Sequence, residues 1–118
     1  MGISPKIMFG KEIVATINDQ VVFEENLKDW MKEMLPENEI QFILWVEDRV
    51  VPKDRVDIDQ ILERMGIDQY NAFEIARKTR ACLMEDDFWI KFKDDDKWQD
   101  NVRARAGYKP TPRKLIFQ

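Results

Sequence analysis

Histidine is absent from this 118-residue sequence, and cysteine occurs once, at Cys82. Without histidine the chain cannot build a His-based metal site, a Ser-His-Asp triad or the usual imidazole proton shuttle. A single cysteine excludes an internal disulfide and is typical of a reducing compartment. Because no histidine is available to activate the Cys82 thiol, we expect Cys82 to be a small core residue.

Long apolar runs are also lacking. The longest, 42–46, has five residues, whereas a helix that spans a bilayer needs about 20. Residues 1–6 contain no apolar signal core, and Lys6 stands where a myristoylation motif requires Ser or Thr. We therefore expect a cytoplasmic protein with no membrane contact.

Charge is unevenly distributed along the chain. Residues 101–118 hold five bases and no acid, whereas the preceding residues hold 14 bases and 23 acids. An acidic body with a basic tail suggests either self-association, and so a possible homo-oligomer, or a solvated end. Proteins that bind single-stranded nucleic acids combine basic residues with aromatic ones, and the five bases with Tyr108 are a weak version of this pattern. These candidate nucleic-acid residues are Arg103, Arg105, Lys109, Arg113 and Lys114.

Local patterns predict the secondary structure. Apolar, β-branched segments separated by turn residues predict strands at 7–9, 12–17 and 21–23. Apolar spacings of three and four, with capping residues, predict helices over 27–35, 37–48, 58–65 and 69–80. The second of these is apolar almost all round, so we expect it to be largely buried as the core of the domain.

These elements predict an α+β fold class. We expect a small N-terminal antiparallel sheet or hairpin followed by four short helices and a late strand, in a single domain. A hydrophobic fraction of 44% beside 36% charged residues is typical of a globular chain. The domain is expected to span 1–102, with 103–118 as a basic C-terminal tail that is extended or docked on a partner.

The late strand lies in a stretch, 85–100, that holds two of the four tryptophans and seven acidic residues. Strand alternation places Phe88, Ile90 and Phe92 on one face, which belongs in the core. Trp89 and Lys91 fall on the other face, where Trp89 is expected to cover a second, shallower cluster with Trp98.

The acidic residues of this stretch do not form a recognisable metal motif. Consecutive residues such as Asp86 and Asp87, or the run 94–96, point in alternating directions, and the EF-hand spacing is not met. We expect a solvated turn, with no metal and no cofactor. Arg49, Lys53 and Arg55 could bind an anion, but we prefer pairing of these arginines with nearby or acidic-run carboxylates.

Several short motifs occur in a fixed order between residues 35 and 102. Trp45 is followed by the R-x-x-P-x-x-R pattern of Arg49, Pro52 and Arg55. A short helix ending at Met65-Gly66, the strand Asp86-x-Phe88-Trp89-Ile90-Lys91 and finally Trp98-x-Asp100 complete the series. In this order the motifs resemble the segment that precedes the catalytic domain in HipA-like kinases of Firmicutes.

The resemblance implies a stand-alone relative of a non-catalytic accessory region. Where the family usually carries a Ser-Leu-Ser or Ser-Leu-Thr step, this chain has Ala81-Cys82-Leu83-Met84-Glu85. The sequence stops where the kinase lobe would begin, so neither a catalytic-loop aspartate nor a metal-binding aspartate is carried over. We therefore expect no enzyme activity.

We expect a non-catalytic protein–protein interaction or regulatory module, in a toxin–antitoxin, mobile-element or phage-defence system. Its partner is expected to be a protein whose identity the sequence does not indicate. The alternative is a nucleic-acid-related protein, which binds through the basic tail or acts as an acidic charge mimic that inhibits a nucleic-acid-binding protein. The expected partner-binding residues are Arg49, Arg55, Trp89, Lys91 and Trp98.

Overall fold

A four-stranded antiparallel sheet forms the centre of the molecule, shown by a computed structural model that describes residues 4–118. Strands β1 (Lys6–Phe9), β2 (Glu12–Asn18) and β3 (Gln20–Phe23) form a meander. The turns between them place Gly10 and Asp19 in left-handed conformations, with φ of 61° and 62°, as tight hairpin turns require. The predicted N-terminal antiparallel sheet is therefore confirmed.

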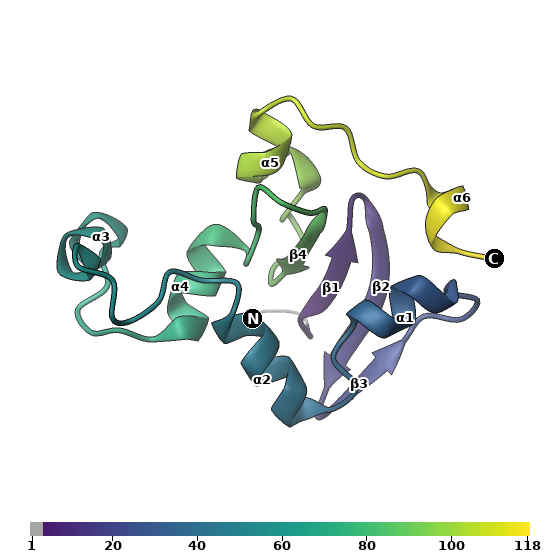
Figure 1. Ribbon diagram of the computed structural model, residues 1–118, viewed down its shortest axis with the longest axis horizontal. Coiled ribbons are helices and arrows are strands. Elements are labelled where there is room, and N and C mark those ends of the chain that lie inside the picture. The colour runs from purple at the N-terminus through teal and green to yellow at the C-terminus, as the bar shows by residue number, and fades with distance from the viewer. Residues whose placement is uncertain (1–3) are drawn as a thin grey trace.

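The predicted late strand, β4 (Phe88–Lys91), completes the sheet. It pairs antiparallel with β1, with Met8 opposite Trp89, so that the strand order is β3-β2-β1-β4 (Figure 1). On the outer side of β4, the Ile90 N–H donates to the Arg80 carbonyl at 2.7 Å. This hydrogen bond satisfies one donor on an edge that would otherwise be open.

The four predicted helices are present, and each lies within or matches its predicted range. They are α1 (Asp29–Met34), α2 (Glu39–Glu47), α3 (Ile58–Met65) and α4 (Ala72–Thr79). Side chains of Asn38 and Asn71 accept hydrogen bonds from the first turns of α2 and α4, which stabilises helix starts. Gly66 ends α3 with φ of 74° in the left-handed cap that glycine favours. In Figure 1, α3 lies farthest from the sheet.

Residues beyond the expected boundary at 102 pack on the same domain. They include part of the short helix α5 (Val102–Arg105), which follows the 3-10 turn η1 (Trp98–Asp100), and helix α6 (Arg113–Ile116). Ile116 is fully buried in the same cluster as Ile7, and Phe117 forms an antiparallel bridge with Leu27. The tail is therefore docked on its own chain, along the path traced in Figure 1.

The two faces of the sheet carry separate clusters, as alternation predicts. Phe88, Ile90 and Phe92 belong to the main core, together with residues such as Val14 and Met31. On the opposite face a smaller cluster joins Met8, Cys82, Trp89 and Trp98. The predicted Trp89–Trp98 cluster and the burial of Cys82 are confirmed.

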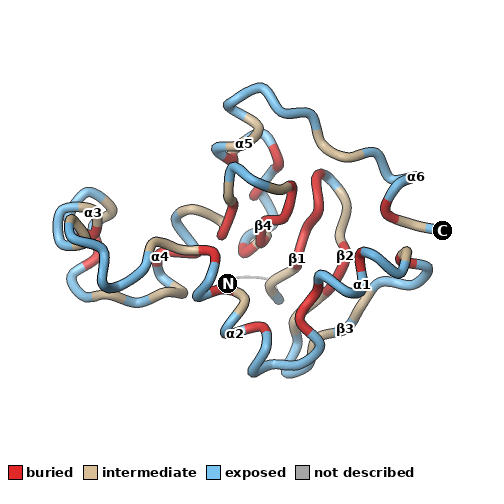
Figure 2. The backbone as a smooth tube through the Cα atoms, viewed as in Figure 1, coloured by how far each residue is buried: buried red, intermediate tan, exposed pale blue. Residues whose placement is uncertain are grey.

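The expectation that the second helix is largely buried is wrong. Phe42 and Val46 of α2 are buried, but Ile40, Ile43 and Leu44 are 74%, 39% and 56% exposed. The two buried residues are four apart and form a single stripe that faces the core. Since the rest of the molecule covers only this stripe, most of α2 is exposed (Figure 2).

None of the helices within residues 4–118 has the length and apolar character that a membrane crossing requires. Residues 1–3, on which the expectation of a missing leader partly rests, lie outside the described part of the chain.

Candidate functional site

Arg49 was expected to contact a partner, but its side chain makes hydrogen bonds within the domain. Its guanidinium forms a two-point ion pair with Asp86 and also donates to the carbonyls of Ala81 and Phe88. It stacks over the Trp45 ring, 4.7 Å from the ring centroid. Arg49 is only 8% exposed, so its predicted exposure is wrong, and its Nε, Nη1 and Nη2 atoms all donate within the chain.

Arg55 lies apart from Arg49 and is exposed. Its Nε donates to Asp57 Oδ1 at 2.7 Å, and both side chains are about half exposed, at 55% and 44%. The preferred pairing with a nearby carboxylate is therefore confirmed for Arg55. Arg49 also pairs with a carboxylate, but its partner, Asp86, is neither near it in sequence nor part of the run 94–96. Arg55 stays a predicted partner contact.

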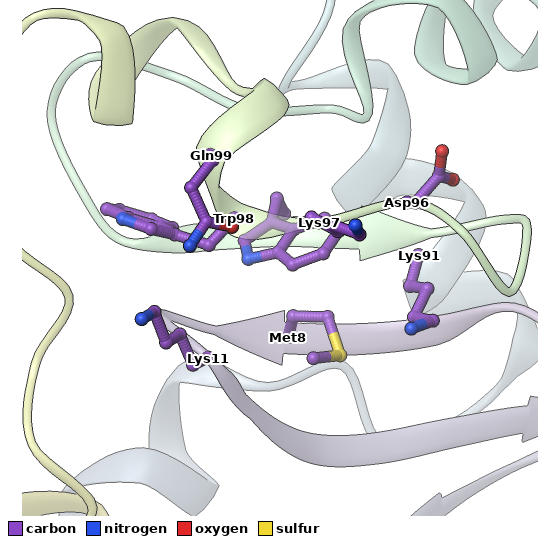
Figure 3. Close-up of a pocket in the computed structure, with 8 residues that line it drawn as sticks. Met8, Lys11, Lys91, Asp96, Lys97, Trp98 and Gln99 are labelled. Carbon is purple, nitrogen blue, oxygen red and sulfur yellow. The ribbon is translucent and has the colours of Figure 1, made fainter.

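Three of the predicted partner residues, Trp89, Lys91 and Trp98, come together at one hollow of about 240 Å³. We refer to this hollow as the lysine pocket; its lining residues are Met8, Lys11, Trp89, Lys91, Asp96, Lys97, Trp98 and Gln99. Figure 3 shows Lys11 and Lys91 at opposite ends with Met8 between them, and Lys97, Trp98 and Gln99 along the other wall.

The two indoles form the base of the lysine pocket and are not open aromatic surfaces. Trp89 and Trp98 are 1% and 4% exposed, so the expectation of an exposed aromatic anchor is wrong. Trp89 Nε1 donates to the Gly10 carbonyl at 2.7 Å, which ties β4 to the turn after β1. The lysines, of which Lys11 and Lys97 are exposed and Lys91 is half-buried, are the groups that a ligand can reach.

The acidic stretch is not a solvated turn throughout. Asp87 and Asp96 are only 3% and 7% exposed. Asp87 accepts hydrogen bonds from Arg103 and from both the backbone N–H and the hydroxyl of Thr111. Within residues 4–118 no group of three or more acidic, cysteine or histidine side chains could hold a metal ion.

The Cys82 thiol and the Tyr70 hydroxyl both have raised pKa values. Burial raises the pKa of the Cys82 thiol, an effect that nearby arginines partly oppose. Burial also raises the pKa of the Tyr70 hydroxyl, with Glu47 and Asp54 adding to the shift, and that hydroxyl donates to the Val51 carbonyl. Both shifts favour the protonated, neutral form, whereas activation of a nucleophile calls for a lowered pKa.

The basic tail offers fewer accessible cations than its sequence indicates. Arg103 pairs with Asp87 and is only 17% exposed, whereas Arg113 pairs with Glu12 but stays 66% exposed. Arg105, Lys109 and Lys114 are exposed. They are spread over a segment that packs on the domain, so nucleic-acid binding by the tail stays a prediction.

The exposed side of α2 is a surface that sequence reasoning missed. Ile40, Ile43 and Leu44 form what we refer to as the α2 face. A hollow of about 240 Å³ is lined by Leu44 and by Met34, which is 49% exposed, and Ile40 lines a second hollow of about 390 Å³. The two hollows are lined by four acids and no base; these acids are Asp19, Glu37, Glu39 and Asp48.

Comparisons with protein-family models, with curated proteins and with solved structures give no match for this chain.

Proposed function

We propose that this protein is a non-catalytic interaction module that binds a partner protein through the α2 face. The observation that carries the proposal is the exposure of Ile40, Ile43 and Leu44, at 74%, 39% and 56%, on consecutive turns of one helix. Contiguous apolar surface of this kind is typical of protein–protein contacts. The neighbouring hollows provide space for apolar side chains of a partner.

The charge around the α2 face favours a basic partner. All four charged residues that line its two hollows are acids. A second copy of this chain, placed face to face by a two-fold axis, would bring acid against acid and lose affinity. The occupant that fits is a segment of another protein, such as an amphipathic helix, with apolar anchors flanked by Lys or Arg.

The resemblance to the accessory segment of HipA-like kinases supports a regulatory setting for this contact. We propose that the partner belongs to a toxin–antitoxin, mobile-element or phage-defence system. Arg49, Trp89 and Trp98, which carry the resemblance, have structural roles in the fold. In this proposal they preserve a shared scaffold, and α2 supplies the contact with the partner.

The binding test uses two synthetic amphipathic helical peptides with identical leucines, one carrying lysines and the other glutamates. Fluorescence anisotropy at several salt concentrations measures their affinities. We expect the lysine peptide to bind more tightly, and the double variant Ile40→Gln/Leu44→Gln to lose at least about tenfold in affinity because apolar burial is removed.

Val56→Gln is the matched control, since Val56 is fully exposed but lies outside the α2 face. It should leave peptide binding unchanged. Equal binding of the two peptides, or equal losses in the control and the double variant, would contradict the proposal. Dimerisation that depends on Ile40, measured by sedimentation, would identify a second copy as the occupant and overturn the basic partner.

The acidic rim also favours a second candidate, a charge mimic that occupies a basic nucleic-acid-binding protein. In that case affinity would depend steeply on salt. The variant Glu37→Gln/Glu39→Gln would then abolish binding, whereas Ile40→Gln/Leu44→Gln would leave it nearly intact. The two pairs of variants therefore separate apolar docking from charge mimicry.

A further inference from the structure

The lysine pocket has a charge opposite to that of the molecule. The chain carries a net charge of −4, yet Lys11, Lys91 and Lys97 all line one hollow, with Lys11 and Lys91 at its opposite ends (Figure 3). Within residues 4–118, none of the three lysines has a carboxylate within 4.0 Å. The cations are therefore available to a ligand.

The single acid in the lining does not neutralise these lysines. The carboxylate of Asp96 accepts hydrogen bonds from Arg80 Nε at 3.1 Å and from the backbone N–H groups of Phe92 and Lys93, both at 3.0 Å. The Asp96 carboxylate thus accepts three hydrogen bonds, one of them from a charged arginine, and its charge is already paired. The pocket keeps a surplus of positive charge above a base of buried Met8, Trp89 and Trp98, and this charge attracts an anion.

The backbone positions of the lysines are fixed by hydrogen bonds. The Trp89 indole holds the turn that carries Lys11, and Asp96 closes the loop between Lys91 and Lys97. The Lys97 N–H donates to Asp100 Oδ2 at 3.1 Å. Binding at this site therefore orders side chains but not backbone, which lowers its entropic cost.

We propose that the lysine pocket binds a phosphate group. A phosphate dianion offers three or more oxygen acceptors, enough for all three ammonium groups once the flexible side chains of Lys11 and Lys91 turn inwards from the two ends of the pocket, whereas a carboxylate offers two oxygens and one charge. The volume of about 240 Å³ leaves space for a small esterified group beside the phosphate, where the Gln99 amide can hydrogen-bond to it. The ligand is inorganic phosphate or a small phosphate monoester.

The test compares two triple variants of equal net charge. Lys11→Gln/Lys91→Gln/Lys97→Gln removes the cations of the pocket. Lys32→Gln/Lys53→Gln/Lys78→Gln removes three exposed lysines elsewhere. Each protein is titrated with inorganic phosphate and with glycerol 3-phosphate at constant ionic strength, while two-dimensional ¹H–¹⁵N NMR follows the indole and backbone N–H signals.

We expect saturable shifts at the Trp89 and Trp98 indoles and at residues 97–99 of the unmodified protein. The pocket variant should lose at least about tenfold in affinity, and the control less than about twofold, since charge-assisted hydrogen bonds are lost only in the first. Equal losses in the two variants, or shifts that never saturate, would overturn the proposal. Tighter binding of glycerol 3-phosphate identifies an ester, and equal or weaker binding identifies the free ion; either result supports the site.

Because this pocket shares no residue with the α2 face, failure of one proposal leaves the other standing.

Discussion

Nη1 and Nη2 of Arg49 donate to the two carboxylate oxygens of Asp86, at 2.9 and 2.7 Å. These residues lie 37 positions apart, one just after α2 and the other just before β4. The guanidinium also bonds the Phe88 and Ala81 carbonyls. The ion pair therefore joins α2, the segment after α4, and the late strand into one unit.

Replacing Arg49 with Ala should lower the free energy of unfolding by about 3 kcal/mol or more, because it leaves a partly buried carboxylate and two carbonyls without their partner. Urea denaturation measures this change. Arg55→Ala is the control, and it should cost less than about 1 kcal/mol because its ion pair is exposed. Similar losses in the two variants would contradict the internal role of Arg49.

The hydroxyl of Thr111 donates to buried Asp87 at 2.6 Å, and Thr111→Val removes this donor with little change of shape. We expect a loss of about 1–3 kcal/mol, because the carboxylate is left short of a hydrogen bond. Amide hydrogen exchange at residues 113–117 should also become faster, since this contact helps dock the tail.

Thr16→Val provides the control for Thr111. Thr16 lies in β2, and the structure gives it no side-chain hydrogen bond within the described residues. The Thr16→Val substitution should hardly change the free energy of unfolding, since valine is favoured in β-strands. If Thr111→Val leaves hydrogen exchange in the tail unchanged, the Asp87 contact does not hold the tail.

Asn101 is 1% exposed, and neither its side-chain nitrogen nor its side-chain oxygen has a hydrogen-bond partner among residues 4–118. Replacement by leucine, which has a similar shape, should be neutral or raise stability by about 1 kcal/mol, because an unsatisfied amide no longer needs to be buried. Thermal unfolding measures the change.

Asn38→Leu is the contrasting variant, because the Asn38 side chain accepts the Gln41 N–H at the start of α2. It should cost about 1 kcal/mol through loss of the helix cap. Strong destabilisation by Asn101→Leu would show that the Asn101 amide has a partner in solution.

Stability should decrease at alkaline pH, in part through Cys82. Burial raises the pKa of this thiol in the folded state, so the folded protein holds the proton more tightly than the unfolded chain does. The resulting stabilisation is fully present below the unfolded thiol pKa of about 8.5 and is lost as pH rises through the folded value.

The measurement for Cys82 is the difference in unfolding free energy between the unmodified protein and Cys82→Ala, followed from about pH 7 to about pH 10. Taking the difference cancels the contribution of Tyr70, whose hydroxyl pKa is raised in the same direction. A difference that does not change with pH would show that the thiol titrates as freely in the folded protein as in the unfolded chain.

Elements whose ends are set by local chemistry could be predicted from the sequence. Turn residues around Gly10 delimited the first strands, and Gly66 and the apolar spacing located α3. Strand alternation also separated Phe88 and Ile90 from Trp89 correctly. In each case the deciding interactions lie within a few residues along the chain.

Features that depend on distant segments could not be predicted. A helix that is apolar on most sides gives no periodic signal for the face that is buried, so the exposure of Ile43 and Leu44 was missed. The charged partners of Arg49 and Asp87, which are Asp86 and Arg103, lie 37 and 16 positions away, and several other acids and bases would have fitted equally well. The lysine pocket likewise needs β1, β4 and η1 in place before its lysines line one hollow.

The pairing of β1 with β4 also bears on how fast the protein folds. The β1–β2–β3 meander closes only short loops, and hairpins of this size form within about 1–10 μs. By contrast, the bond between Gly10 and the Trp89 indole spans 79 residues, and contacts of such sequence separation slow folding because the entropy of loop closure is lost before the contact is made. The meander is therefore expected to form early, and the lysine pocket exists only once the fourth strand has been added.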